Sequence, residues 1–146
     1  MKFVIQRVKE AAVHVDGATV AEIRKGLLVF VGLEKGDTAA LFPKAIDKIA
    51  GMRIFSDEND KMNLSVNDIG GEVLLVSQFT LAGDISKGKR PSYDNAMPVE
   101  EARTLYASFV DAFTGVFPRT KNGCFQAMMD VRLVNDGPVT IIYELN

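Results

Sequence analysis

The residues best suited to chemistry in this chain are neutral, and they fall in two short segments. Ser77-Gln78-Phe79-Thr80-Leu81 closes an apolar run and places hydroxyl and amide groups where a strand is expected to end. Asn135-Asp136-Gly137-Pro138-Val139-Thr140 interrupts a second apolar run near the end of the sequence. Such groups supply no strong acid or base, but a backbone N–H aimed at a developing oxyanion contributes about 2.7 to 4 kcal/mol in a water-poor site. The chemistry they suit is stabilisation of a transition state in a substrate that is already reactive.

Gly137-Pro138 is the most unusual dipeptide of the second segment. Asp-Gly between apolar residues is typical of a hairpin turn, because Gly supplies a positive φ. The Pro that follows makes this peptide bond one that can be cis, although only about 5 to 6% of X-Pro bonds in folded proteins are. The residues alone favour an ordinary trans hairpin turn and leave the cis form open.

Side chains that usually act as bases, nucleophiles or metal ligands are scarce. His14 is the only histidine and Cys124 the only cysteine, and neither has a partner beside it in the sequence. This excludes an internal disulfide and a multi-thiolate site, so we expect no metal and no cofactor. Thr80 as a covalent nucleophile is an alternative that requires an adjacent base, and the sequence shows none.

Length and composition indicate one globular domain over residues 1–146. The chain is 47% hydrophobic and 25% charged, with a formal net charge of -2. A domain of this length buries about 68 to 70% of its unfolded surface, which permits a substantial core. The charge argues against extended, sequence-independent binding to nucleic acid, and we expect no DNA partner. No window approaches 18 consecutive apolar residues and no signal-peptide pattern is present, so we expect a cytoplasmic protein without a membrane partner.

Apolar spacing and turn signals predict many strands and two main helices. The expected strands are 2–8, a hairpin over 12–23, 27–33, 62–66, 72–81, 125–133 and 139–143. The expected helices lie within 39–53 and over about 99–113. Residues 82–95 combine Gly, Pro, Lys and Arg and are typical of a loop long enough to be functional. These elements predict an α+β fold with a mostly antiparallel sheet.

The two segments resemble the two signature motifs of the D-aminoacyl-tRNA deacylases. The match extends over nearly the whole chain, in the family's order, through the stretches IQRV (5–8), KMNLSV (61–66), GGEV (70–73), GKRPS (88–92) and Leu105-Tyr106. The resemblance implies a sheet closed into a β-barrel-like core and a homodimer. It also implies hydrolysis of the ester that joins a D-amino acid to tRNA, with glycyl-tRNA as a second substrate class. Such an ester is intrinsically reactive, and the ribose 2′-OH beside it is available to assist.

The resemblance implies roles for the residues of the first motif. The backbone donors of Phe79 and Thr80 would lie near the scissile carbonyl, and Ser77 and Gln78 would orient the site. We rank this mechanism above nucleophilic attack by the Thr80 hydroxyl.

The second motif would select the enantiomer. By resemblance, Gly137 and Pro138 form a cis dipeptide that enters the site of the partner subunit, and Arg7 braces it. An L side chain would point into this backbone and a D side chain into solvent, so selection would be by exclusion.

Phe125 and Met129 stand where the family forms part of the pocket for the terminal adenosine of tRNA. The family usually shows Phe-Gly-Ala followed closely by Met, whereas this chain has Phe125-Gln126-Ala127-Met128-Met129, and residues 117–122 are also atypical. The geometry of this pocket therefore does not follow from the resemblance.

A competing hypothesis is a non-enzymatic nucleic-acid-binding or assembly protein with the same fold. The basic stretch at residues 87–90 would fit it, as it would fit contacts with tRNA phosphates, although such charges usually mark a solvated loop. This hypothesis leaves the joint occurrence of the two motifs without a reason.

Overall fold

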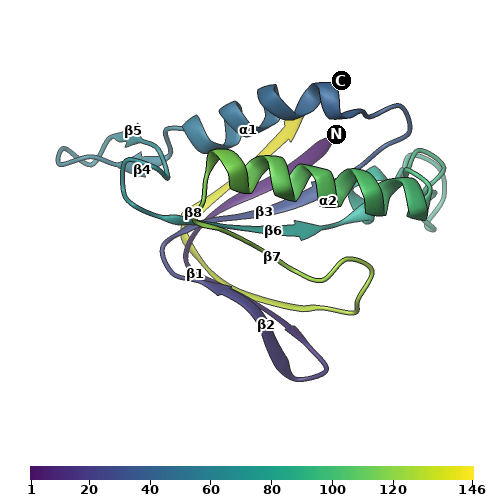
Figure 1. The fold of residues 1–146 in the computed structure, drawn as a ribbon, viewed down its shortest axis with the longest axis horizontal. Coiled ribbons are helices and arrows are strands. Elements are labelled where there is room, and N and C mark those ends of the chain that lie inside the picture. The colour runs from purple at the N-terminus through teal and green to yellow at the C-terminus, as the bar shows by residue number, and fades with distance from the viewer.

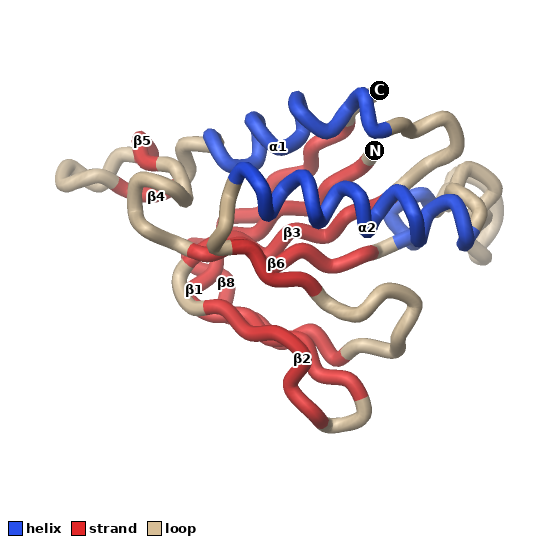
Figure 2. Tube along the Cα trace, viewed as in Figure 1, coloured by secondary structure: helices blue, strands red, loops and turns tan.

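The computed structural model describes residues 1–146 as a curled sheet with two helices across one face (Figure 1). Figure 2 shows the strands running beneath both helices and curling away from them at one end. The sheet contains β1 (Lys2–Val15), β2 (Ala18–Ile23), β3 (Gly26–Gly32), β6 (Glu72–Ser77), β7 (Thr120–Asn122) and β8 (Asp130–Glu144). A separate small pair is β4 (Phe55–Ser56) with β5 (Met62–Leu64), and the helices are α1 (Phe42–Gly51), α2 (Val99–Val116) and the 3-10 turns η1 (Ala39–Leu41) and η2 (Phe79–Ala82).

The strand order is β2-β1-β3-β6-β7, and β8 pairs with the other side of β1. β1 is antiparallel to β2, β3 and β8, but β3–β6 and β6–β7 are parallel. The prediction of a mostly antiparallel sheet is therefore wrong, and the sheet is mixed. The reason is that α1 lies between β3 and β6 in the sequence and α2 between β6 and β7, and a helical crossover joins parallel strands.

The expected barrel-like closure is present, although it is incomplete. β1 is long enough to pair with β3 through its first half and with β2 through its second half. The second half curls until β2 approaches β7, and the Lys121 ammonium group donates to the Glu22 carbonyl at 2.6 Å. The two edges of the sheet thus come close together without a continuous ladder between them.

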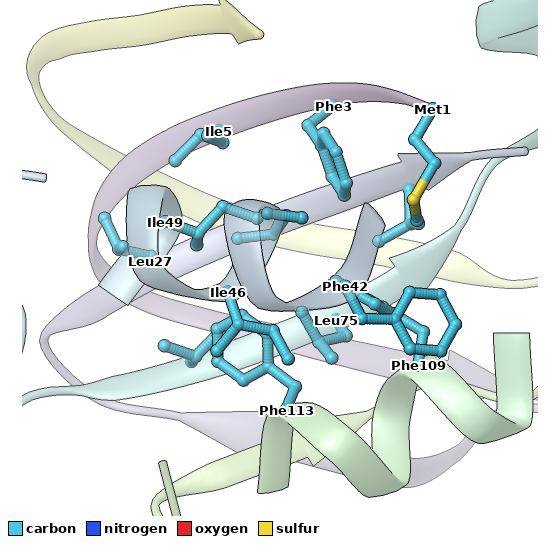
Figure 3. Close-up of a cluster of buried hydrophobic side chains, with 14 of the residues drawn as sticks. Met1, Phe3, Ile5, Leu27, Phe42, Ile46, Ile49, Leu75, Phe109 and Phe113 are labelled. Carbon is cyan, nitrogen blue, oxygen red and sulfur yellow. The ribbon is translucent and has the colours of Figure 1, made fainter. Parts of the chain in front are cut away.

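Two apolar clusters occupy the two faces of the sheet. The larger has 22 buried residues and lies under the helices, where α1 contributes Ile46 and Ile49 and α2 contributes Phe109 and Phe113 (Figure 3). The smaller has eight, including Leu28 and Leu74, and fills the curled part of the sheet. Because β3 and β6 are covered on both faces, they read as continuous apolar runs. No helix of the structure is both long enough and apolar enough to span a membrane.

Several boundaries differ from those predicted. The hairpin around Asp16-Gly17 and both helices are confirmed, with α2 running three residues past its predicted end. The expected strand 72–81 ends at Ser77 and gives way to η2. The expected strand 125–133 begins only at Asp130, and β7 was not predicted.

Candidate active site

The first motif lies where β6 ends and the chain turns into η2. The Gln78 amide continues the ladder by donating to the Val31 carbonyl at 2.8 Å. The Leu81 amide then donates to the Gln78 carbonyl and the Gly83 amide to the Thr80 carbonyl. The amides of Phe79 and Thr80, the first two residues of η2, have no acceptor in the chain, as is usual at the start of a helix. Two adjacent exposed residues therefore present free backbone donors.

Close packing of η2 against β3 and one side-chain hydrogen bond fix this pair of donors in place. Gly32 at the end of β3 allows η2 to approach, since a Cβ there would lie 2.8 Å from the Leu81 Cβ and 3.2 Å from the Gln78 carbonyl oxygen. The Gln78 side-chain amide donates to the Thr80 hydroxyl oxygen at 2.5 Å. That amide is no base, so the structure gives the Thr80 hydroxyl no group that would activate it.

The second motif is a wide bulge inside a continuous strand, and the predicted hairpin turn is wrong. Gln6 pairs with Thr140 and Val8 with Asn135, so the single residue Arg7 of β1 faces the four residues 136–139 of β8. The chain does not reverse, because both flanks of the motif pair with β1 in the same direction. The Gly137-Pro138 peptide bond is cis, the isomer that the resemblance implies.

Asn135 holds the base of the bulge closed. Its side-chain oxygen accepts from the Val139 amide at 2.7 Å, and its side-chain nitrogen lies 3.1 Å from the Val139 carbonyl to which it donates. The side chain thus replaces a strand partner where the ladder is interrupted. Gly137 and Pro138 lie between the two residues joined by these hydrogen bonds, Asn135 and Val139, and are exposed.

Arg7 of β1 supports the bulge through hydrogen bonds. Its side chain leaves β1 opposite the bulge and is largely buried, with 9% of the residue exposed. The Nε atom donates to the Asp136 carbonyl at 2.8 Å and an Nη atom donates to the Ile54 carbonyl at 2.5 Å. A weaker ion pair of 3.7 Å joins Nε to the Asp136 carboxylate. Arg7 thus contacts the motif to which the resemblance assigns it, and also ties that motif to the segment before β4.

We expect Arg7→Met to lower the free energy of unfolding by about 3 kcal/mol, because two hydrogen bonds from a charged donor are lost and two carbonyls are left unpaired. Arg132→Met is the matched control, since Arg132 lies on β8, is exposed and makes no ion pair. The control is expected to change stability by less than about 0.5 kcal/mol. Urea unfolding of both variants measures the difference, and equal midpoints would contradict the bracing role.

The two motifs lie far apart within one chain. Ser77 pairs with Val31 on β3, whereas Arg7, which faces the bulge, pairs with Leu27. Four residues along a strand span roughly 13 Å, and the three spacings from β8 through β1 and β3 to β6 add roughly 14 Å across the sheet. No hydrogen bond or ion pair joins the two segments. A single chain therefore does not bring the motifs into one site.

Phe125 and Met129 lie in the loop between β7 and β8 and not on the predicted strand. Phe125 is half-buried against the cluster under the helices, while Met129 packs against the cluster of the curled part. Tyr106 of α2 connects Phe125 to the first motif, because its ring lies 5.7 Å from the Phe125 ring and its hydroxyl lies beside the Ser77 backbone without completing a hydrogen bond. Burial raises the pKa of Tyr106 well above its ordinary value, so the phenol stays neutral.

The remaining candidates lie elsewhere. A polar cavity of about 610 Å³ opens in the curled part and is lined by His14 with charged residues that include Glu22, Glu72 and Arg132. Cys124 is exposed. No three His, Cys, Asp or Glu side chains are grouped closely enough to hold a metal ion.

Sequence reasoning missed Gly32 and Tyr106. Gly32 had a usable signal, since a glycine inside an apolar strand marks a close approach of another backbone. Tyr106 belongs to the Leu105-Tyr106 match of the resemblance, but its place on the apolar stripe of a helix indicates only a core position and no contact with the site.

Comparison with known proteins identifies the family. Residues 4–144 match the family described as D-Tyr-tRNA(Tyr) deacylase. The chain is 56% identical to the D-aminoacyl-tRNA deacylase of Pelobacter propionicus, with 99% of each chain covered, and 54% identical to that of Geobacter sulfurreducens, with 99% of this chain and 95% of the relative covered.

Two solved structures are similar. One is named c-Myc DNA Unwinding Element Binding Protein and has a TM-score of 0.95, 40% identity and coverage of 100% of this chain and 99% of that one. The other, a probable eukaryotic D-amino acid tRNA deacylase, has a TM-score of 0.82 and 17% identity, with 99% and 98% covered, which shows a shared fold. With a family match over almost its whole length and relatives more than 50% identical that are named D-aminoacyl-tRNA deacylase, the chain belongs to the D-Tyr-tRNA(Tyr) deacylase family.

Proposed function

We propose that this hydrolase cleaves the ester bond of D-aminoacyl-tRNA and of glycyl-tRNA, and that two copies of the chain together form each site. The observation that carries the proposal is the pair of free amides at Phe79 and Thr80. It is supported by the family membership and by the names of the curated relatives.

In the proposed mechanism, the ester carbonyl oxygen lies against the Phe79 and Thr80 amides. Water attacks the carbonyl carbon, assisted by the neighbouring ribose 2′-OH, and the oxygen gains negative charge that the two amides stabilise. The bond from the carbonyl carbon to the ribose oxygen then breaks, the ribose oxygen takes up a proton, and free amino acid and tRNA leave. A contribution of about 2.7 to 4 kcal/mol from each donor gives substantial acceleration without a strong base.

Selection of the enantiomer is assigned to Gly137 and Pro138 of a second copy. Both residues are exposed, and within one chain they lie far from η2. A two-fold arrangement would let each bulge enter the partner's site, because two-fold interfaces present the same patch reciprocally. Backbone placed beside the α-carbon would exclude an L side chain while tolerating a D side chain or the hydrogen of glycine.

The face of the sheet away from the helices supports such a dimer. Val4 pairs with Ile142 on one side and Phe30 on the other, so these three side chains form one row across β8, β1 and β3. Their neighbours in sequence pack under the helices, so this row faces the opposite way. Ile142 is 72% exposed, and Val4 and Phe30 are only partly covered. A partly exposed apolar row beside the bulge is the kind of surface that a second copy would bury.

The test is release of tyrosine from matched D-Tyr-tRNA and L-Tyr-tRNA by the wild type, Thr80→Ala and the control Cys124→Ala. We expect hydrolysis of D-Tyr-tRNA alone, with less than about a hundredfold loss in Thr80→Ala, because its backbone amide remains. The control should match the wild type. Nearly complete loss in Thr80→Ala would instead identify its hydroxyl as the nucleophile.

A second candidate function is non-enzymatic binding of nucleic acid, which the name of the 40% identical solved structure favours. Lys87, Lys89 and Arg90 would serve it, since all three are exposed and none makes an ion pair. Measuring tRNA and DNA binding beside the release of tyrosine distinguishes the two functions. A wild type that binds tRNA or DNA without releasing tyrosine would favour this candidate.

A further inference from the structure

Gln126 adopts a backbone conformation that side chains other than glycine rarely take. Its φ is +65°, in the left-handed region, which costs about 1 to 2 kcal/mol for an L residue. The residue lies in the loop before β8 and is exposed, so packing does not hold it there. It is the third residue of a turn in which the Ala127 amide donates to the Cys124 carbonyl at 3.3 Å, and a side-chain contact holds this turn against α2.

That contact comes from Arg103 on α2. An Nη atom of Arg103 donates to the Gln126 side-chain oxygen. The same guanidinium lies over the ring of Phe125, with 5.0 Å from its central carbon to the ring centroid. Its Nε atom also lies 3.7 Å from the Glu100 carboxylate one turn earlier. One guanidinium thus contacts both the side chain of Gln126 and the ring of the residue before it.

Tyr106, one turn after Arg103, contacts the same ring. The Tyr106 and Phe125 centroids are 5.7 Å apart with 34° between the ring planes. Two residues of α2 therefore contact the Phe125 ring. Tyr106 is buried beside Ser77 of the first motif, and Arg103 is exposed. These two contacts set the orientation of the Phe125 ring near the end of β6, where the chain turns into η2.

We propose that Arg103 and Gln126 are positioning residues that fix Phe125 as an apolar wall for the terminal nucleoside of the tRNA. This inference rests on the proposed function. The ring itself would touch the base, while Arg103 and Gln126 act through it. A wall that is set before the substrate arrives costs less ordering on binding, so the effect falls on affinity for the nucleoside and not on the chemical step.

The test compares Arg103→Ala, Arg103→Lys, Gln126→Gly and the double variant Arg103→Ala/Gln126→Gly with the wild type. Arg119→Ala is the matched control, because the Arg119 guanidinium lies 4.9 Å from the Phe117 centroid and bonds the Gly71 carbonyl away from the site. Two quantities are measured: KM and kcat for D-Tyr-tRNA, and Kd for D-tyrosyl-3′-aminoadenosine, in which an amide replaces the ester.

We expect Arg103→Ala to raise KM and Kd about three- to tenfold with kcat within about twofold, from the size of a cation–π contact and one hydrogen bond. Arg103→Lys should recover part of the loss, since it keeps the charge without the planar fork. In the double variant, Gln126→Gly should add nothing to Arg103→Ala, because the two act as one unit. Arg119→Ala should leave KM and Kd unchanged.

Wild-type KM and Kd in Arg103→Ala would overturn the inference, and so would a loss in kcat alone or additive losses in the double variant. If the wild type neither hydrolyses D-Tyr-tRNA nor binds the aminoadenosine, the proposed function itself fails. An active wild type with an unaffected Arg103→Ala removes only the positioning role. These results separate the two failures.

Discussion

Gly137→Ala is expected to reduce hydrolysis of D-Tyr-tRNA by about a hundredfold or more while the chain still folds. Gly137 has a φ of +153°, and a Cβ built on it would lie 2.7 Å from the Val139 Cγ2 atom and 2.8 Å from the Val139 amide nitrogen. The Cβ would also come within 3.3 Å of an Arg7 Nη atom. The bulge must therefore shift, and a displacement near 1 Å in a positioning group can cost about a hundredfold in rate.

The control for this variant is Gly17→Ala in the β1–β2 turn. Gly17 also has a positive φ, +80°, but a Cβ there has no atom within 4 Å. Both variants should lose about 1 to 3 kcal/mol of stability from backbone strain, and only Gly137→Ala should lose activity. Rates on D- and L-Tyr-tRNA, with thermal unfolding of both proteins, measure this. Full activity and an unchanged preference for the D form in Gly137→Ala would remove the bulge from the mechanism.

Gly32→Ala is expected to lower kcat by at least about a hundredfold with a smaller change in KM. The added methyl group would meet the Leu81 Cβ and the Gln78 carbonyl, so η2 must move away from β3 and take the Phe79 and Thr80 amides with it. Removal of one oxyanion donor elsewhere costs about 10² to 10³ in kcat, and here two donors move together.

Gly51→Ala is the matched control, because Gly51 closes α1 and a Cβ there contacts nothing within 4 Å. Single-turnover kinetics on D-Tyr-tRNA separate the chemical step from binding. A Gly32→Ala enzyme with the same kcat as Gly51→Ala would show that the two amides do not stabilise the transition state.

Mixing the two inactive variants tests the cross-subunit scheme directly. In a heterodimer, the Gly137→Ala chain supplies an intact η2 and the Gly32→Ala chain supplies an intact bulge, so one of the two sites is complete. Random exchange makes half of the dimers mixed, and about a quarter of wild-type activity should return. A mixture as inactive as its components would contradict the scheme, as would a protein that is active as a monomer.

The fold was predictable from the sequence where burial determines the pattern. The apolar run at 27–33 and the helical stripe through Phe109 and Phe113 predicted elements that the structure contains, because their side chains face the core. Strand direction was not predictable in this way, since alternation reports which face is buried and not which way a neighbour runs. The parallel pairs on either side of β6 depend on where α1 and α2 lie in the chain order.

The site was predictable as two segments and not as a geometry. Phe79 and Leu81 follow the apolar run of β6 at strand spacing, so nothing local showed that the chain would turn into η2 after Ser77. Asn135 to Thr140 has the composition of a turn, and only its pairing with β1 on both flanks makes it a bulge. Both errors arise because tertiary pairing overrides local preference.

The pairing of β1 with β8 joins the first strand of the chain to the last, from Lys2 opposite Glu144 to His14 opposite Asp130. During synthesis on the ribosome, β1 leaves the exit tunnel long before its partner and must wait with one edge unpaired. Closing so long a loop is entropically costly and is a slow kind of contact to form. The bulge that carries Gly137 therefore takes its place only after all residues between the two strands have been made. Nascent or interrupted chains would have the donors of η2 without the segment assigned to chiral selection, and an open strand edge prone to aggregation.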